Sequence, residues 1–373
     1  MKVVAAIDSF KGSMTSMEAG NAVKKGILAA KPDAEVWLSP LADGGEGTVD
    51  ALIEGLGAEK IPVTVAGPLG EKVSCYYGFL EETKTAVMEM ASAAGITLVI
   101  KKDPLRASTY GVGEMIADAL KRGCKNFMIG IGGSATNDGG IGMLKALGFE
   151  FFDEDGNDVG EGAAALAKIE VIQTENKNPL LSGAKFQIAC DVKNPLCGKQ
   201  GATYIFGSQK GVTEEQKSKV DEAMKHYADV TKESLGCDFA DCEGAGAAGG
   251  LGYAFLSYLA GELIPGVELI LHATGLEEKM KNADVVVTGE GRLDAQTVMG
   301  KAPVGVAALA KKYNAKVIAF AGSVAPEASV CNQAGIDAFF PIVRGVTTLE
   351  EAMKKENAME NIAATAEQVF RLL

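Results

Sequence analysis

The sequence is poor in the side chains on which several familiar types of active site are built. Only two of its 373 residues are histidines, so a histidine-based catalytic centre has little material to draw on. The seven cysteines include no C-x-x-C pair, which argues against a zinc site and against a disulfide framework. We therefore expect any general base to be a carboxylate, and the thiols to be free in a reducing, cytoplasmic location.

Long apolar runs are also missing. The N-terminal run KVVAAI is too short for the apolar part of a signal peptide, and no later run approaches the ~18 residues of a membrane-spanning helix. The formal net charge of −13 argues against a binding surface for nucleic acid or for an anionic membrane. A small anionic ligand would need local cations, which makes any lysine or arginine beside a glycine-rich turn a candidate for binding it.

What the sequence does contain is material for large buried sheets. Hydrophobic residues make up 47% of the chain and charged residues 23%, and the length favours two domains. In the first and last thirds, apolar strand-like runs alternate with helical patterns, which indicates a parallel sheet covered on both faces. The stretch from Lys60 to Leu80, with a turn at Gly67–Gly70, instead indicates a hairpin.

These patterns predict an α/β fold with two domains. We assign residues 1–62, 106–147 and 283–373 to a Rossmann-like domain with a doubly wound parallel sheet, and residues 63–105 and 148–282 to a second, mixed α/β domain. The strands near Val3, Phe127 and Val285 are expected to share the parallel sheet. The active site is expected in the cleft between the domains.

Polar clusters that contain glycine follow directly on five of the apolar runs. They are DSFKGS (8–13), LADGGEG (41–47), GGSATNDGG (132–140), CDVKNP (190–195) and TGEGRLD (288–294). Because parallel α/β sheets bind ligands outside the carboxyl ends of their strands, we expect these clusters to converge on one site. The strand–turn–helix pattern from Lys125 to Gly148 is typical of a turn that binds phosphate through backbone N–H groups. For any one cluster taken alone, an ordinary capped turn is an equally good interpretation.

Together the clusters supply what phosphoryl transfer requires. Glycine turns and a lysine bind phosphate, carboxylates bind Mg²⁺, and an aspartate accepts the proton of a hydroxyl group. A standard P-loop is absent, because the Gly300-Lys301 pair lacks the earlier glycine and is followed by Ala302.

Two other functional classes stay open at this point. The segment Gly130-x-Gly132-x-x-Ala135, with Glu150 downstream, matches a relaxed dinucleotide-binding fingerprint and allows an NAD(P)-dependent 2-hydroxy-acid dehydrogenase. The predicted helix, however, does not follow this fingerprint directly. A non-catalytic protein that binds small anions is the third class, although it would not require so many carboxylates beside the glycines.

Several long strings in the chain resemble the bacterial glycerate kinase family, of the type related to glyoxylate and glucarate breakdown. They are AIDSFKGSMTS, PLADGGEGT, GIGGSATNDGG, CDVKNPLCGKQGA, FGSQKG and TGEGRLDAQTVMGKAPVGVA, in that order along the chain. The resemblance implies ATP-dependent phosphorylation of D-glycerate with Mg²⁺, and 2-phosphoglycerate rather than 3-phosphoglycerate as the product. The partners are then D-glycerate and a nucleotide, with no nucleic acid and no membrane, and the sequence leaves open whether the chain forms a homo-oligomer.

On these motifs we assign roles to individual residues. The catalytic candidates are Asp191, Asp294 and Lys11; the candidates for binding substrate or phosphate are Ser9, Gly44, Gly45, Gly132, Gly133, Ser134, Asn137 and Arg292; and the metal candidates are Asp43, Glu46 and Glu290. Arg292 is assigned to the carboxylate of glycerate because a guanidinium group matches it in shape, and Lys11 to the transferred phosphate. Asp191 is preferred to Asp294 as the base, because Asp294 lies close enough to Glu290 to share a metal with it.

Overall fold

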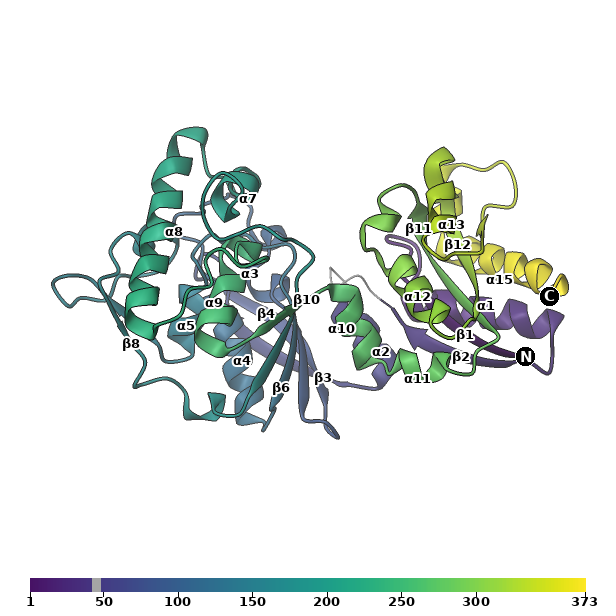
Figure 1. Ribbon diagram of the computed structural model, residues 1–373, viewed down its shortest axis with the longest axis horizontal. Coiled ribbons are helices and arrows are strands. Elements are labelled where there is room, and N and C mark those ends of the chain that lie inside the picture. The colour runs from purple at the N-terminus through teal and green to yellow at the C-terminus, as the bar shows by residue number, and fades with distance from the viewer. Residues whose placement is uncertain (42–47) are drawn as a thin grey trace. The chain divides into compact units, whose positions relative to one another are not determined.

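The computed structural model describes residues 1–41 and 48–373, which fold into two compact units (Figure 1). The first unit holds residues 1–41, 50–57 and 267–373, so both chain ends belong to it. The second unit holds residues 48–49 and 58–266. Within the described part of the chain, no helix is both long enough and apolar enough to span a bilayer.

The first unit is built on a five-stranded parallel sheet with the strand order β13-β12-β11-β1-β2. The strands are β1 (Lys2–Ile7), β2 (Glu35–Pro40), β11 (Val285–Leu293), β12 (Lys316–Val324) and β13 (Ala338–Pro341). From β1 the chain builds outward to β2 on one side, and from β11 it builds outward on the other side. The carboxyl ends of β1 and β11 are therefore the topological switch point, where open α/β sheets bind their ligands.

Helices cover both faces of this sheet. On one face α1 (Ser16–Ala30) and α15 (Lys355–Arg371) pack against each other, over a core that contains Ile7, Val287 and Phe320 (Figure 1). On the other face α12 (Ala302–Lys311) packs against β11 and β12. The remaining elements of the unit are α2 (Thr48–Leu56), α10 (Gly266–Ala273), α11 (Leu276–Met280), α13 (Val330–Gln333), α14 (Leu349–Met353) and the 3₁₀ turns η4 (Thr297–Met299) and η5 (Pro326–Ser329). The predicted doubly wound parallel sheet is confirmed.

The second unit is built on a mixed six-stranded sheet with the order β10-β9-β6-β5-β4-β3. The strands are β3 (Glu59–Ala66), β4 (Lys72–Leu80), β5 (Thr85–Glu89), β6 (Asn126–Gly130), β9 (Lys185–Ala189) and β10 (Glu262–Ile264). β3, β4 and β5 pair antiparallel, and β5, β6, β9 and β10 pair parallel. The expected hairpin is confirmed, since β3 and β4 are joined by a turn in which the Gly67 N–H donates to the Glu71 carbonyl.

Helices and short turns complete the second unit. They are α3 (Ala91–Ala94), η1 (Ile96–Leu98), α4 (Tyr110–Lys121), α5 (Ile141–Ala146), α6 (Ala163–Leu166), η2 (Pro179–Leu181), α7 (Ala202–Lys210), α8 (Glu214–Leu235), η3 (Ala247–Gly249) and α9 (Leu251–Leu259), with a small antiparallel sheet of β7 (Glu150–Phe152) and β8 (Val171–Gln173). The core of this unit includes a cluster of aromatic rings, among them Phe151, Tyr227 and Tyr253.

One part of the predicted domain organisation is wrong. Val3 and Val285 do pair in one parallel sheet, as expected, but the strand at Phe127 is β6 and belongs to the sheet of the second unit. It pairs with β5, the strand before it in the chain, through a connection that contains α4, and with β9, the next strand of that sheet along the chain. Pairing between strands that are close in sequence is the usual outcome. Residues 106–147 consequently lie in the second unit.

Candidate active site

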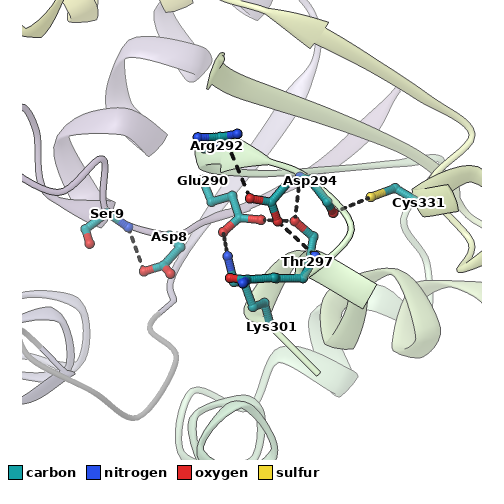
Figure 2. A network of polar contacts seen from close by, with 9 residues as sticks. Asp8, Ser9, Glu290, Arg292, Asp294, Thr297, Lys301 and Cys331 are labelled. Carbon is teal, nitrogen blue, oxygen red and sulfur yellow. Dashed lines mark hydrogen bonds and ion pairs between the residues drawn. The ribbon is translucent and has the colours of Figure 1, made fainter. Parts of the chain in front are cut away.

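In the first unit, the predicted site residues gather at the carboxyl ends of β1 and β11. Asp8 follows β1 directly, and its backbone N–H donates to the Gly289 carbonyl of β11 at 2.9 Å. Asp8 is the residue after β1, and Glu290 lies within the neighbouring strand β11, three residues before its end (Figure 2). The sheet topology therefore brings DSFKGS and TGEGRLD together, as the sequence predicted.

A buried threonine links the Glu290 carboxylate to the backbone of Asp294 in the TGEGRLD cluster. The Thr297 hydroxyl donates to Glu290 Oε1 at 2.7 Å and accepts from the Asp294 N–H at 3.1 Å (Figure 2). Lys301 Nζ lies 3.6 Å from Glu290 Oε2. Burial raises the pKa of Glu290, while the Thr297 hydrogen bond and Lys301 oppose that shift. Sequence reasoning missed Thr297 and Lys301, although both lie in the TGEGRLDAQTVMGKAPVGVA string.

Arg292 forms the exposed side of this cluster and is paired with Asp294, which is largely covered. Arg292 Nε lies 3.5 Å from Asp294 Oδ2, and the arginine side chain is 65% exposed. Asp294 Oδ1 also accepts the N–H of Gln296 at 2.9 Å, and the Asp294 carbonyl accepts from the thiol of Cys331. An exposed guanidinium that is anchored at one side presents N–H donors to an anionic ligand.

The turn after β1 carries two further predicted residues. The Ser9 N–H donates to Asp8 Oδ1 at 2.7 Å, and Lys11 is exposed in the turn between β1 and α1. Two hydrogen bonds between the backbones of Phe10 and Met14 shape this turn. The predicted residues Asp43, Gly44, Gly45 and Glu46 lie outside the described residues.

In the second unit, the predicted residues lie beyond the adjacent strands β6 and β9, whose last residues, Gly130 and Ala189, are paired. After β6 the chain runs through residues 131–140 without regular structure before α5 begins, and we call this segment the glycine turn. Gly132 and Gly133 are exposed in it, whereas Ser134 is only 7% exposed. Gly133 has a φ of +74°, a conformation that favours glycine.

Asp138 anchors the glycine turn from inside the protein. Its carboxylate is fully buried and accepts four hydrogen bonds, from the N–H and hydroxyl of Thr109 and from the N–H groups of Gly140 and Gly142. Burial raises its pKa, and these hydrogen bonds oppose the shift. Asp138 therefore holds the starts of α4 and α5 together.

Asn137 and the neighbouring carbonyl are bound by α7. The Asn137 side chain is fully buried, and its Nδ2 donates to Thr203 Oγ1 at 3.0 Å. Lys210 Nζ donates to the Thr136 carbonyl at 2.7 Å. Asn137 thus helps to hold the turn, and its predicted hydrogen bond to a phosphate would have to come from the second N–H of a side chain that is fully buried.

Asp191 lies two residues beyond the end of β9 and is exposed. Its Oδ1 accepts the N–H of Gly266 at 2.9 Å, which orients the carboxylate. Among residues 1–41 and 48–373, no three or more histidine, cysteine or acidic side chains are grouped in a way that could hold a metal ion.

Comparisons with known proteins agree over nearly the whole chain. The model of the glycerate kinase family matches residues 3–373. The chain belongs to this family. It is 45% identical to the glycerate kinase of Bacillus subtilis (strain 168), over 99% of this chain and 97% of that one. It is also 45% identical to the glycerate 2-kinase of Escherichia coli (strain K12), over 98% of each. A crystal structure of a protein designated glycerate kinase 2 from Salmonella typhimurium LT2 matches with a TM-score of 0.92 and 42% identity, over 99% of this chain and 97% of that one.

Membership of the glycerate kinase family confirms that the chain is an enzyme and a kinase, as the sequence predicted. The dehydrogenase alternative is wrong, and the structure shows why its fingerprint misled. Residues 136–140 separate Ala135 from the start of α5, so no helix opens directly after the fingerprint. Glu150 lies in β7, where its carboxylate accepts from Asn176. Assignment to a kinase family also excludes the alternative of a non-catalytic protein that binds small anions.

Proposed function

We propose that the chain transfers the γ-phosphoryl group of ATP to the 2-hydroxyl group of D-glycerate, with Mg²⁺, to give 2-phosphoglycerate. One observation carries the proposal: two carboxylates and two cations lie within a short segment at the switch point of the parallel sheet. Phosphoryl transfer depends mainly on positioning and on charge, and this segment supplies charge of both signs. The choice of hydroxyl is supported by the printed name of the Escherichia coli relative, glycerate 2-kinase.

The oxygen atoms of this segment fit Mg²⁺. The ion is usually held by one or two carboxylates together with water and substrate phosphates, which is a smaller protein contribution than most metals need. Glu290 and Asp294 supply such a pair, because the hydroxyl group of Thr297 binds both the Glu290 carboxylate and the backbone N–H of Asp294. When bound, Mg²⁺ neutralises charge on the phosphate oxygens of ATP. Asp43 and Glu46 remain our proposed additional ligands.

Arg292 is our proposed ligand for the carboxylate of glycerate. Its exposed guanidinium group has the planar fork of donors that binds a carboxylate in two places, and Asp294 holds it at one side. Lys11 is proposed to bind the transferred phosphate as a point charge from its exposed turn, next to Ser9.

The second unit is proposed to contribute phosphate-binding N–H groups and a base. Gly132 and Gly133 leave the backbone of the glycine turn open to solvent, with Ser134 next to them. Asp191 is exposed and accepts the N–H of Gly266, and we propose that it accepts the proton of the glycerate hydroxyl group. We also propose a cytoplasmic location, because all seven cysteines carry free thiols.

The test is a phosphotransfer assay with purified protein, ATP, Mg²⁺ and D-glycerate, in which ³¹P NMR identifies the product. We expect a resonance that matches authentic 2-phosphoglycerate, and loss of turnover when EDTA removes Mg²⁺. A resonance that matches 3-phosphoglycerate would overturn the choice of hydroxyl but not the kinase. Absence of any phosphorylated product would overturn the proposed reaction.

A further inference from the structure

Helix α7 contacts the glycine turn from both of its ends. Thr203, in its first turn, accepts the hydrogen bond from Asn137, and Lys210, its last residue, donates to the Thr136 carbonyl. The two contacts fall on adjacent residues of the turn, although six residues of helix lie between Thr203 and Lys210. Neither Thr203 nor Lys210 is among the site residues predicted from the sequence, although both lie in or beside the strings that mark the family.

Both polar side chains are buried, although an apolar side chain at either position would avoid the free-energy cost of removing a polar group from water. Thr203 is fully buried and Lys210 is 2% exposed, and lysine is almost never buried this deeply without a specific partner. Removing the ammonium group from water lowers the pKa of Lys210 to about 7, and the nearby carboxylate of Asp138 opposes that shift. A polar contact that the fold retains at such a cost points to a requirement on the shape of the turn rather than on stability.

The glycine turn is thereby held from two directions. Asp138 ties it to the starts of α4 and α5, and α7 holds Thr136 and Asn137. Gly132 and Gly133, which lie just before these anchored residues, stay exposed and carry no side chain that could cover their backbone. The anchors therefore fix the part of the turn that is open to a ligand without occupying it.

We propose that α7 positions the glycine turn for ligand binding, with Thr203 and Lys210 as its two positioning residues. Neither residue contacts a substrate; both act through the backbone of residues 131–140. The expected effect of these two residues on catalysis rests on the proposed function, whereas their expected effect on the conformation of the turn does not. The experiment therefore has one arm that needs no activity.

The first arm compares Thr203→Val with Thr203→Ser by hydrogen exchange of ligand-free protein. Valine removes the hydroxyl group and nearly keeps the volume, while serine keeps the hydroxyl group and removes a methyl group. We expect amide exchange in peptides covering residues 131–142 to be at least about fivefold faster in Thr203→Val, with β6 unchanged and Thr203→Ser close to the parent. Equal exchange in the two folded variants, or faster exchange only in Thr203→Ser, would overturn the proposal.

The second arm measures steady-state kinetics of Lys210→Met, with Lys225→Met as the matched control. Lys225 is exposed on α8 and has no part in the site. We expect the KM of one substrate, the one that the glycine turn binds, to rise about tenfold or more while the KM of the other stays unchanged. A merely structural residue would lower the apparent kcat through loss of folded protein and leave both KM values as they are, and that result would overturn the proposal.

The arms also separate this inference from the proposed function. If the parent protein shows no phosphotransfer, the proposed function fails, and hydrogen exchange alone decides whether α7 holds the turn. If Lys210→Met does not fold, the Thr203 pair, which changes only one hydroxyl group or one methyl group, decides the same question.

Discussion

At the residue scale, three aspartates of the sequence motifs have three different surroundings. Asp138 is fully buried and accepts four hydrogen bonds, Asp294 is paired with an arginine, and Asp191 is exposed. In the sequence all three follow apolar strands and look alike. Their surroundings separate a structural anchor from the two candidates for the base.

Replacement of the base should remove most of the turnover and little of the stability. We expect Asp191→Asn to lower kcat by roughly 10²–10⁴-fold, because asparagine cannot accept the hydroxyl proton. Asp294→Asn should instead raise the Mg²⁺ concentration needed for half-maximal activity, if Asp294 shares the metal with Glu290. Both are measured at saturating ATP and D-glycerate, on variants whose melting temperature matches the parent.

Asp153→Asn is the control for this pair. Asp153 accepts hydrogen bonds from the N–H groups of Asp155 and Asn157 in an exposed turn. Its replacement therefore shows how the loss of a turn-capping carboxylate changes stability and turnover. Its loss should cost about 0.5–2 kcal/mol of stability and leave turnover intact. A value of kcat above about a tenth of the parent in both Asp191→Asn and Asp294→Asn would mean that neither is the base.

At the element scale, most strands and helices could be predicted from the sequence. The strand from Lys2, the helix from Tyr110 to Lys121 and the hairpin around Gly67 occur as expected, because apolar runs, turn residues and helical periodicity are local signals. The contacts that hold the glycine turn could not be predicted. Thr203 and Lys210 lie far along the chain from residues 136–137, and a buried lysine looks like a surface lysine in a sequence.

Replacement of Gly140 by a larger residue should destabilise the fold in two ways, through backbone strain and through a steric clash with α9. The φ of Gly140 is +79°, and an added Cβ would lie 2.4 Å from the Cβ of Ala254 in α9. We expect Gly140→Ala to lower the free energy of unfolding by about 2–5 kcal/mol, from backbone strain and from overpacking together. Urea unfolding followed by circular dichroism measures the change.

Gly156→Ala is the matched control. Gly156 also has a φ of +79°, but an added Cβ there would meet nothing within 4 Å. This variant should therefore show the backbone cost alone, about 1–2 kcal/mol. If the two variants lose the same stability, close packing between the glycine turn and α9 contributes nothing.

At the scale of the whole molecule, the fold class could be predicted from the sequence, but the sheet to which each strand belongs could not. β6 is as apolar as β1 and β11, so composition did not indicate which sheet it joins. The pairing is decided by contacts of β6 with β5 and β9 over their full length, which are tertiary interactions. The same limit applies to the site, since the pairing of β1 with β11 brings Asp8, just after β1, next to the part of β11 that holds Glu290.

The pH dependence of the free energy of unfolding should reveal the lowered pKa of Lys210 in the folded protein. In the folded protein burial lowers its pKa to about 7, whereas the unfolded chain keeps the ordinary value of 10.5. Between these values the unfolded chain holds a proton that the folded chain has released, so a rise in pH favours the folded state. Relative to Lys210→Met, the parent should gain stability from pH 7 to pH 9, with a slope that approaches roughly 1.4 kcal/mol per pH unit.

Urea unfolding of both proteins at pH 7, 8 and 9 measures this difference, and groups that titrate alike in both proteins cancel in it. A difference that stays flat across the range, or that falls as the pH rises, would show that Lys210 keeps an ordinary pKa in the folded protein.

The pairing of β1 with β11 also determines how late in synthesis the parallel sheet can be completed. Lys2 donates its backbone N–H to the carboxylate of Asp284, a residue 282 positions later. At roughly 5–20 residues per second, a ribosome needs on the order of 15 to 55 s to cover that interval. The second unit is complete at residue 266, before β11 has been made. The nascent chain thus carries a complete second unit while β1, which can already pair with β2, still lacks β11 on its other edge, and this is the interval in which a chaperone has an unpaired strand edge to shield.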